Sequence, residues 1–545
     1  MVLLTSMMLS LFTTMVLIPI FKHQAVRLQA IDFPSTRSIH TDPKPRIGGI
    51  AMACGILTPV LIWTPNDPFI TSVILGAGLI VLIGFIDDQR DLNYKLKFAG
   101  QLMAASLVIF YGDLAIRFTG NLLPPGMQIP DWLALPLTFF VIVGVTNAIN
   151  LSDGLDGLAG GIALLCFSCI AIVAYQSGHY AIAMIAATVI GAIFAFLRFN
   201  TYPAVIFMGD AGSLLLGFLA VTLSLGLSQS SETISPLFPL LLLGFPILDT
   251  LRVIIERISE GRSPFHADRN HFHHKLIALG FLHTEAVVII YLLQAFLVAF
   301  AYMGRFRSEW FLLVSYLLFS AAVLASLSII RRTAWRSGRP MRITQLVAVQ
   351  LQRIKEKSVL IKISYWTVWI LLPALLHLTC LLPKQVSGLF ASLALTAAGG
   401  LFVIMVYEPR WLEKLLRVVL YGLIPGLVYA CQRSTVAWLD PNFERIYNLM
   451  FIVLVAFVLC MLKFTRRQNG FKTTPTDFLI LFIALIVPNL PDAQIQSYQM
   501  GLFAAKLIAL LFSFEVLIGE LRGELNGLSL NVIAALLLIA GRGVL

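Results

Sequence analysis

Charged residues are scarce in this 545-residue sequence. Asp, Glu, Lys and Arg together make up 12% of the side chains, whereas 58% are hydrophobic and the mean hydropathy is +0.88. Soluble domains carry roughly 25% charged residues. The composition therefore excludes an ordinary soluble enzyme and predicts a multi-pass membrane protein.

Cysteine is also infrequent, and its six positions lie in or beside apolar runs. This distribution indicates neither a disulfide framework nor a thiolate metal site. Cys166 and Cys169 form a CxxC pair inside an apolar run, where we expect them to pack on one helix face rather than carry redox chemistry. The net charge of +11 is not gathered in an aromatic-rich soluble domain, so we expect no nucleic-acid partner.

Long apolar runs dominate the chain. A membrane-spanning helix needs about 20 apolar residues. About 18 such runs can be counted, and those near 132–149, 476–490 and 526–544 are the weakest. The predicted fold class is all-α: a polytopic membrane helix bundle, with about 11 helices before residue 331 and about 7 after it.

The positions of Lys and Arg predict the topology of these runs. The first run, residues 2–21, has no Lys or Arg before it and five in the stretch that follows, which places the N-terminus outside. A signal peptide has the opposite charge order, so we interpret this run as an uncleaved first helix. Alternation then puts 31 Lys and Arg on cytoplasmic loops and seven on outer loops. This bias predicts a multi-pass protein of the inner (plasma) membrane.

The longest basic stretch, residues 331–360, divides the chain. Its apolar residues are spaced so that part of it could lie as an amphipathic helix on the anionic inner leaflet. We expect a membrane domain over residues 1–330, a basic cytoplasmic linker over 331–360, and an additional transmembrane module over 361–545. This last module contains no cluster of carboxylates or histidines, and we leave its function open.

Ionisable groups are costly at membrane depth, so clusters of them mark candidate functional sites. Four clusters lie at predicted cytoplasmic helix ends. The first contains the adjacent carboxylates Asp87 and Asp88. Neighbouring carboxylates repel each other unless a cation or a proton separates them, which suits Mg²⁺ or a base near a phosphate. The alternative is a solvated helix end that pairs with Arg90 and Lys95.

The second cluster lies within residues 147–161. It contains two amides, Asn147 and Asn150, and two carboxylates, Asp153 and Asp156, and the members of each pair are three residues apart. One helical turn would place each pair on one side. Glycines in the same stretch let the backbone approach a ligand closely. We therefore predict a ligand-binding loop rather than a plain connection.

The third cluster is a short stretch around Asp210 that opens a predicted helix. Gly209 and Gly212 flank this carboxylate closely, and Ser213 is a candidate cap. Backbone N–H groups at a helix N-terminus bind anions, and the carboxylate can hold a metal that the anion shares. The alternative is that Asp210 is itself the N-cap.

The fourth cluster has four histidines within nine residues: His266, His271, His273 and His274. No HExxH motif and no cysteine accompany them, so a hydrolytic zinc centre is poorly supported. Imidazoles together with Arg269 and Lys275 can instead donate hydrogen bonds to phosphate oxygens. We predict an anion-binding loop.

The order of these motifs resembles that of the polyprenyl-phosphate N-acetylhexosamine 1-phosphate transferases, in particular the bacterial undecaprenyl-phosphate N-acetylglucosamine 1-phosphate transferases. The resemblance covers about residues 1–330. Besides the four clusters, the matching residues are Asp32-Phe33-Pro34 through Arg37, His40, Pro43, Pro45, Arg46, Gly48, Gly49, Lys97 and Gln101.

The resemblance implies transfer of GlcNAc 1-phosphate from UDP-GlcNAc to undecaprenyl phosphate, with release of UMP, on the cytoplasmic face. This step initiates cell-surface glycans such as cell-wall polymers or lipopolysaccharide. The resemblance also implies Mg²⁺, with Mn²⁺ as an alternative, held by Asn150 and Asp210. It implies catalytic roles for Asp87 and Asp88, contact of Lys97 with the lipid phosphate, nucleotide-sugar recognition by the histidine loop, and a homodimer.

Charge repulsion is the main barrier to such a reaction, because donor and acceptor are both anions. A metal and cationic groups must lower this repulsion during in-line attack. A phosphate monoester is mostly dianionic at pH 7, so we expect general-base help from Asp87 to be modest. A two-step route through a carboxylate–phosphate intermediate stays open, and so do GalNAc or a modified hexosamine as the sugar.

Two other functions stay open at this point. One is a multi-pass transporter, which predicts ionisable groups on both sides of the membrane midplane. Here the clusters gather on one predicted face, which favours interfacial chemistry. The other is a bifunctional glycan-handling protein whose C-terminal half acts on the lipid-linked product.

Overall fold

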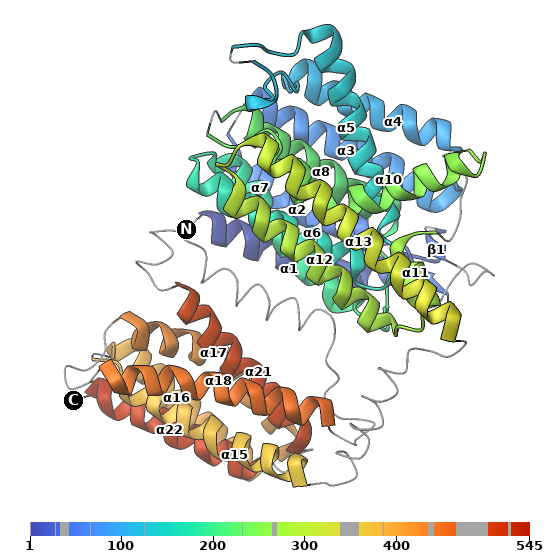
Figure 1. The fold of residues 1–545 in the computed structure, drawn as a ribbon. Helices are drawn as coiled ribbons and strands as arrows, with labels where there is room; N and C mark the ends of the chain where they lie inside the picture. The colour runs from blue at the N-terminus through green and yellow to red at the C-terminus, as the bar shows by residue number, and fades with distance from the viewer. Residues whose placement is uncertain are drawn as a thin grey trace. The chain divides into compact units, whose positions relative to one another are not determined.

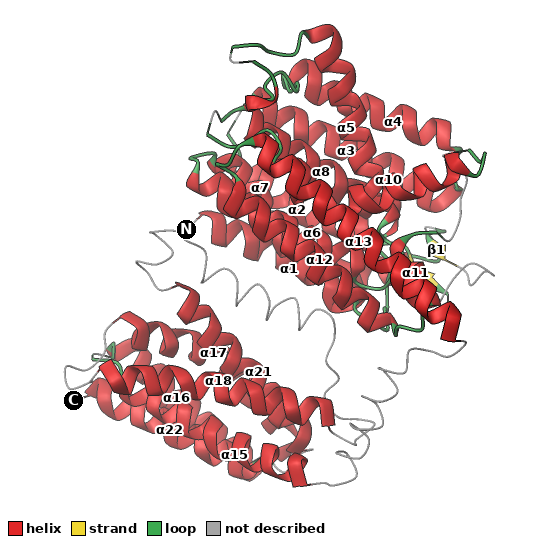
Figure 2. Ribbon diagram, in the orientation of Figure 1, coloured by secondary structure: helices red, strands yellow, loops and turns green. Residues whose placement is uncertain are grey.

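The computed structural model describes residues 2–27, 29–32, 43–65, 67–124, 126–231, 233–263, 270–337, 359–384, 386–433, 441–464, 500–521 and 525–544. Within these ranges the chain forms nineteen α-helices and almost no strand (Figures 1 and 2). The predicted all-α class is confirmed. The described helices make two compact units, α1 to α13 and α15 to α22.

The described part of the first unit contains thirteen helices, most of which are labelled in Figure 1. They are α1 (Val2–Gln24), α2 (Gly48–Trp63), α3 (Pro68–Arg90), α4 (Tyr94–Ser106), α5 (Asp131–Leu151), α6 (Leu158–Gln176), α7 (Tyr180–Asn200), α8 (Gly209–Gln229), α9 (Phe238–Leu242), α10 (Gly244–Ser259), α11 (Phe272–Ala278), α12 (His283–Gly304) and α13 (Glu309–Ser337).

Eight helices of this unit are long and apolar enough to cross a membrane: α1, α3, α5, α6, α7, α8, α12 and α13. Three further apolar runs belong to shorter or interrupted helices. Helix α2 is short, α4 continues into the π-helix η1 (Leu107–Tyr111), and α9 and α10 are separated by Leu243 alone. These account for the eleven runs that the sequence predicts before residue 331, including the weak one near 132–149, which is α5.

Helix α8 lies at the centre of the first unit. Every residue from Ala211 to Ser228 is buried, and α2, α3, α5 and α6 all pack against it. A helix that is apolar on every side is stable only when other helices surround it. The packing therefore fixes where the N-terminal turn of α8, which carries Asp210, can lie.

Small residues let two helices approach the first turn of α8. A Cβ atom added at Gly84 of α3 would lie 2.5 Å from the Ala211 Cα, and one added at Gly49 of α2 would overlap the backbone of Gly212. Such close approach gains dispersion contacts between backbones. It also brings the last turn of α3 beside the first turn of α8.

A short β-hairpin lies next to this helix end. Strand β1 (Ile31–Asp32) pairs antiparallel with β2 (Lys44–Pro45), and Arg46 bridges to Phe207. The N–H groups of Gly48 and Gly49 donate to the carbonyls of Phe207 and Met208 at 3.0 and 2.8 Å. The segment before α2 is thereby attached to the segment before α8. Arg37 and His40, which contribute to the resemblance, lie outside the described residues.

The second unit has its own helices and apolar core. Its helices are α15 (Val359–Leu381), α16 (Gly388–Tyr407), α17 (Leu412–Arg433), α18 (Pro441–Phe464), α21 (Met500–Leu521) and α22 (Asn526–Val544). Helices α15, α16 and α22 meet the criteria for a membrane span. The weak run near 526–544 is α22. The run near 476–490 and residues 338–358 of the basic stretch lie outside the described residues.

Lys506 is a buried cation among the described residues of the second unit. This residue is 5% exposed, and its ammonium lies 4.6 Å from the centre of the Tyr447 ring. The Tyr447 hydroxyl shares a 2.7 Å hydrogen bond with Thr379. A cation over an aromatic face is stabilised by the ring quadrupole, so these contacts account for a lysine inside an apolar bundle.

The contact between α3 and α8 predicts the effect of a single methyl group. We expect Gly84→Ala to separate the two helices and to lower the free energy of unfolding by about 1–3 kcal/mol, because backbone atoms of α8 cannot move out of the way. Gly78→Ala, on the same helix with nothing within 4 Å of the added Cβ, is the matched control. Thermal unfolding of the purified protein in detergent measures both, and equal melting temperatures for the two variants would contradict the predicted contact.

Candidate functional site

Four helix ends meet at one point of the first unit. Asp87 lies in the last turn of α3, Lys97 in the first turn of α4, Asn150 in the last turn of α5 and Asp210 in the first turn of α8. The Lys97 ammonium forms ion pairs with Asp87 and, at 3.1 Å, with Asp210. The Asn150 amide donates to Asp210 Oδ1 at 3.0 Å and to Ser213 Oγ at 2.8 Å. The structure therefore brings together the first, second and third clusters of the sequence.

The two adjacent aspartates make different contacts. Asp88 is 7% exposed, and its carboxylate accepts the backbone N–H groups of Asp210 at 2.8 Å and Ala211 at 3.1 Å. It therefore caps α8 from a different helix. Asp87 instead accepts from Leu92 N at 2.7 Å and pairs with Lys97. Asp87 thus contacts the Lys97 ammonium, whereas Asp88 contacts the backbone N–H groups at the start of α8.

The start of α8 differs from both sequence-based expectations. Its N-cap position is Met208, and no side chain of its own segment caps it. Ser213 donates to the Gly209 carbonyl at 3.0 Å, so the expectation that Ser213 caps the helix is wrong. Gly209 has φ +72° and lies against the Asp88 carboxylate, where a Cβ atom would overlap it. Asp88 of α3 caps α8 instead. Because Asp88 is far from α8 in the sequence, residue spacing does not predict this contact.

The residues at this point have the ligand chemistry that Mg²⁺ prefers. The described residues contain no group of three His, Cys, Asp or Glu side chains arranged around a metal. Mg²⁺ commonly uses only one or two carboxylates and keeps water and phosphate oxygens as its other ligands. Asp210 supplies a carboxylate, and a half-turn of the Asn150 amide would present an oxygen beside it. Because the Lys97 ammonium already lies between Asp87 and Asp210, the position favours positive charge, and these residues fit a hard divalent cation.

Asn147 joins α5 to α4. Its amide and that of Gln101 exchange two hydrogen bonds, at 2.6 and 3.3 Å, and it also donates to the Val143 carbonyl at 2.7 Å. Asn147 thus lies one turn from Asn150 on the same helix, as predicted. Its contacts within the protein indicate that it holds α5 and α4 together beneath the site.

The segment after α5 is a series of turns, not a helical turn. Asp156 accepts from Ala204 N at 2.9 Å, and its own N–H donates to His283 Nε2 at 3.2 Å. The expectation that one helical turn puts Asp153 and Asp156 on one side is therefore wrong: Asp156 anchors the loop. Removal from water raises the pKa of Asp153 to about 7, and the charges of Asp210 and Asp156 add to this shift.

Three histidines of the fourth cluster are described: His271, His273 and His274. His266 and Arg269 lie outside the described residues. The rings of His271 and His273 are nearly parallel at 5.9 Å, and those of His273 and His274 lie 4.2 Å apart. A Cβ atom added at Gly154 would overlap His273 Nε2, so this ring rests on the loop after α5. The fourth cluster therefore adjoins the second.

His273 is buried and uncharged. It is 3% exposed, and its Nε2 atom has no hydrogen-bond partner among the described residues. Burial lowers its pKa to about 3, and neighbouring His274 adds to the shift. A buried imidazole nitrogen without a partner is costly, so this atom is suited to a hydrogen bond with a ligand.

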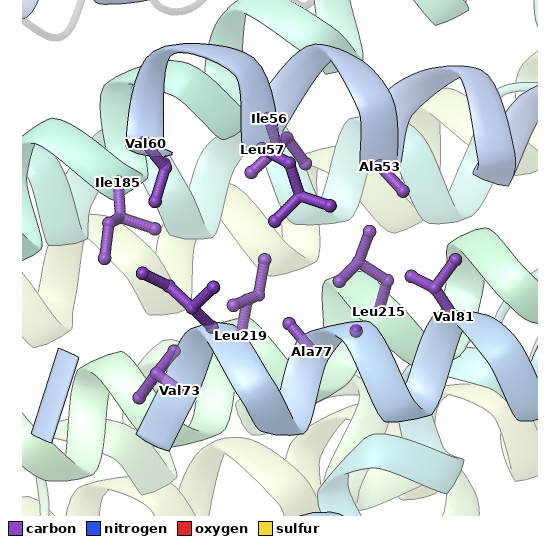
Figure 3. Close-up of a pocket in the computed structure, with 12 residues that line it drawn as sticks. Ala53, Ile56, Leu57, Val60, Val73, Ala77, Val81, Ile185, Leu215 and Leu219 are labelled. Carbon is purple, nitrogen blue, oxygen red and sulfur yellow. The ribbon is translucent and has the colours of Figure 1, made fainter. Parts of the chain in front are cut away.

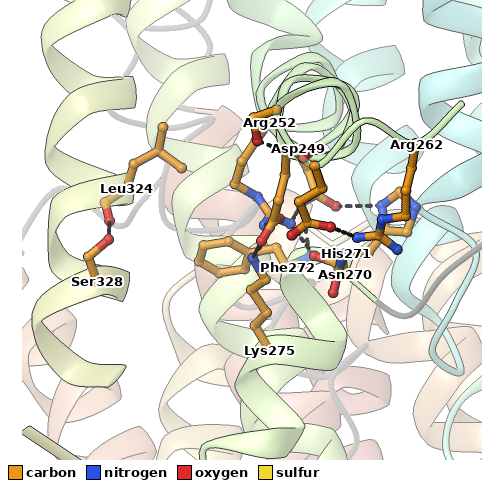
Figure 4. A network of polar contacts seen from close by, with 12 residues as sticks. Asp249, Arg252, Arg262, Asn270, His271, Phe272, Lys275, Leu324 and Ser328 are labelled. Atoms are coloured by element: carbon orange, nitrogen blue, oxygen red, sulfur yellow. Dashed lines mark hydrogen bonds and ion pairs between the residues drawn. The ribbon is translucent and has the colours of Figure 1, made fainter. Parts of the chain in front are cut away.

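Two residues that lie next to the site, Arg46 and Asp249, are not among the site residues that the sequence predicts. Arg46 pairs with Asp32 at 2.6 Å and lies near enough to Asp88 and Asp210 to interact with their charges. Asp249 of α10 contacts the histidine loop (Figure 4). The signal for Asp249 is the spacing of Asp249, Arg252 and Glu256, which places three charged residues on one face of this helix.

The fold and this site define a class: a polytopic membrane protein with carboxylate, amide and ammonium groups gathered at the ends of its central helices. The glycosyl transferase family 4 model matches residues 70–228. Those residues include Asp87, Lys97, Asn150 and Asp210.

Curated relatives point the same way. The chain is 40% identical over 288 residues to a probable undecaprenyl-phosphate N-acetylglucosaminyl 1-phosphate transferase of Bacillus subtilis (strain 168), covering 52% of this chain and 80% of that protein. It is 31% identical over 325 residues to an undecaprenyl-phosphate alpha-N-acetylglucosaminyl 1-phosphate transferase of Yersinia pestis, covering 58% of this chain and 87% of that protein. For a decaprenyl-phosphate N-acetylglucosaminephosphotransferase of Mycolicibacterium smegmatis the identity is 35% over 304 residues, covering 49% and 73%. The chain belongs to this family of polyprenyl-phosphate N-acetylhexosamine 1-phosphate transferases, and the second unit is unassigned.

The cap that Asp88 provides predicts a loss of stability. We expect Asp88→Ala to lower the free energy of unfolding by about 1–2 kcal/mol, because two N–H groups at the buried start of α8 lose their acceptor. Asp91→Asn removes an exposed carboxylate three residues away and serves as the control, with no change expected. Melting temperatures in detergent measure the difference. If Asp88→Ala has the same melting temperature as the wild type, the carboxylate does not cap α8.

Proposed function

We propose that the chain transfers GlcNAc 1-phosphate from UDP-GlcNAc to undecaprenyl phosphate and releases UMP. The observation that carries this proposal is the position of Lys97 between Asp87 and Asp210, with Asn150 adjoining Asp210. One point thus offers both an ammonium for a phosphate and oxygen ligands for a divalent cation. The printed names of the relatives support the same acceptor and sugar.

The residues have separate tasks in this reaction. Asp210 and Asn150 would hold Mg²⁺, and the ion would supply positive charge that offsets the negative charge of the donor diphosphate. Lys97 binds the acceptor phosphate, because its ammonium can exchange one carboxylate partner for a phosphate oxygen. Asp87 keeps Lys97 oriented, and Asp88 keeps the first turn of α8 in place.

The reaction is a substitution at the β-phosphorus of the nucleotide sugar. An oxygen of the lipid phosphate forms the new P–O bond while the bond to the UMP oxygen breaks, and UMP leaves as an anion. The lipid phosphate is largely dianionic at pH 7 and needs little deprotonation. Orientation and charge neutralisation are therefore the main catalytic terms.

The site belongs, by this proposal, to the cytoplasmic face of the inner membrane, with the N-terminus outside. The count of 31 Lys and Arg on one side against seven on the other supports this orientation. UDP-sugars are cytoplasmic metabolites, so the donor and the site then meet in one compartment. The second unit is proposed to be an accessory or scaffolding membrane module.

A transfer assay tests the whole proposal. Membranes with the full chain receive sugar-labelled UDP-GlcNAc, undecaprenyl phosphate and Mg²⁺, and lipid-extractable label and UMP are counted. We expect equimolar label and UMP, and loss of both when Mg²⁺ is chelated. If a well-folded full chain transfers label from no UDP-hexosamine, the proposal is wrong.

In the same assay we expect Asp210→Ala to lower the rate by roughly 100-fold or more, because it removes a charge at the reacting phosphates. Asp131→Asn is the control. It removes an exposed carboxylate at the end of α5 that lies opposite to Asn150. Similar rates for the two variants would place the chemistry elsewhere.

The contact between Gly154 and His273 gives a separate prediction. We expect Gly154→Ala to push the His273 ring away and to reduce the rate at limiting UDP-GlcNAc by roughly ten-fold, which corresponds to the loss of one ligand hydrogen bond. Gly144→Ala, on the adjacent helix α5 with open space around the added Cβ, should retain the wild-type rate. An unchanged rate for Gly154→Ala would show that His273 does not depend on this loop.

A further inference from the structure

A buried carboxylate, that of Asp249, fastens the described part of the histidine loop to α10. Its Oδ2 atom contacts His271 Nδ1 at 3.0 Å, and its Oδ1 atom accepts from Arg252 at 2.7 Å and from Phe272 N at 2.9 Å. Figure 4 shows these groups pointing toward one another, with the Arg252 guanidinium also donating to the Asn270 carbonyl. Asp249 and His271 are each 6% exposed.

Because Asp249 and His271 are both buried, their contact determines which ring nitrogen of His271 carries a proton. An ionised carboxylate accepts hydrogen bonds and does not donate them, so the His271 Nδ1 atom that faces Asp249 must carry the proton. The contact therefore fixes both the orientation of the ring and its tautomer. Nε2 is then the only ring nitrogen that His271 can present to a ligand.

The surroundings of His271 connect this nitrogen to the reaction site. The parallel ring of His273 lies 5.9 Å away and rests on Gly154. That glycine is in the loop four residues after Asn150, whose amide contacts Asp210. The Asp249–His271 pair therefore lies beside the same loop that joins the proposed metal ligands to the histidines.

We propose that Asp249 is a positioning residue that holds His271 by Nδ1 and aims Nε2 at a hydrogen-bond donor of the nucleotide sugar, such as a hydroxyl group. With the Nδ1 proton directed at the Asp249 carboxylate, Nε2 accepts this hydrogen bond, and Asp249 sets the orientation and tautomer of the ring as a carboxylate does for the histidine of hydrolase triads. This inference rests on the proposed function, because it names the donor substrate of the same site. Asp249 itself contacts no substrate.

A second contact between α10 and α11 makes it possible to test whether Asp249 orients His271 or only anchors the loop. Lys275 pairs with Glu256 at 2.9 Å, about two turns beyond Asp249 on α10 and about one turn beyond His271 on α11. Glu256→Gln weakens this attachment and the 3.1 Å ion pair of Glu256 with Arg252, but Glu256 makes no contact with His271 or Asp249. A role of Asp249 as a mere anchor of the loop predicts the same effect for both variants, whereas the positioning role predicts an effect for Asp249 alone.

Steady-state kinetics of the full chain test the inference with Asp249→Asn, His271→Asn, the double variant and Glu256→Gln. His271→Asn keeps an amide near the Nδ1 position but lacks Nε2. We expect Asp249→Asn and His271→Asn each to raise the KM for UDP-GlcNAc by roughly ten-fold or more, with the KM for undecaprenyl phosphate unchanged. The double variant should be no worse than His271→Asn, and Glu256→Gln should match the wild type.

Three results would overturn the inference. Multiplying effects in the double variant would mean that Asp249 acts independently of His271. A Glu256→Gln effect equal to that of Asp249→Asn would mean that the carboxylate only anchors the loop. An unchanged KM for UDP-GlcNAc in Asp249→Asn would mean that the pair does not face the donor.

Equilibrium binding of UDP-GlcNAc to the purified full-length variants separates this inference from the proposed function. If the wild type binds UDP-GlcNAc but transfers nothing, the proposed function fails, and the inference is still decided by whether Asp249→Asn weakens binding roughly ten-fold. If the wild type binds no UDP-hexosamine, both are wrong.

Discussion

The first unit depends on how the buried start of α8 satisfies its backbone. The first N–H groups of a helix have no partner within that helix, and at a buried end water cannot supply one. Asp88 supplies two acceptor bonds from the end of α3, and the absence of a side chain at Gly84 and Gly49 lets α3 and α2 come close enough. Once these helices are fixed, the adjoining residue Asp87 must lie beside the first turn of α8. The site is thus a consequence of capping one helix with another.

Charge balance is the second constraint on this site. Two carboxylates, Asp87 and Asp210, would repel each other without a cation, and Lys97 lies where it pairs with both. A site that balances its own charges in this way can exchange partners at low cost when a divalent cation and an anionic substrate enter together. Phosphoryl transfer between two anions requires that kind of exchange, which is why the arrangement supports the proposed reaction better than transport does.

Local patterns were sufficient for much of the organisation. Hydropathy alone predicted the all-α class and the eleven runs before residue 331, because each span must be apolar over its own length. The cost of ionisable groups in a bilayer singled out Asp87, Asp210 and the histidines as candidate site residues, and the structure brings Asp87 and Asp210 to one point. Details of hydrogen bonding were not accessible in this way. Ser213 was expected to cap α8 and does not, and Asp156 was expected to share a helical face with Asp153 and instead binds the Ala204 N–H.

The sequence by itself determined which segments are helices and which polar residues are too costly to be incidental, because both follow from the burial of neighbouring residues in one chain segment. Only the tertiary structure decided the partners. Asp88 and Asp210 are separated by 122 positions and Asp249 and His271 by 22, yet each pair is joined by hydrogen bonds. A carboxylate accepts from whichever donor the packing brings near it, and packing depends on contacts between helices that no local pattern encodes. For this reason two adjacent aspartates that look equivalent in the sequence, Asp87 and Asp88, make different contacts in the folded protein.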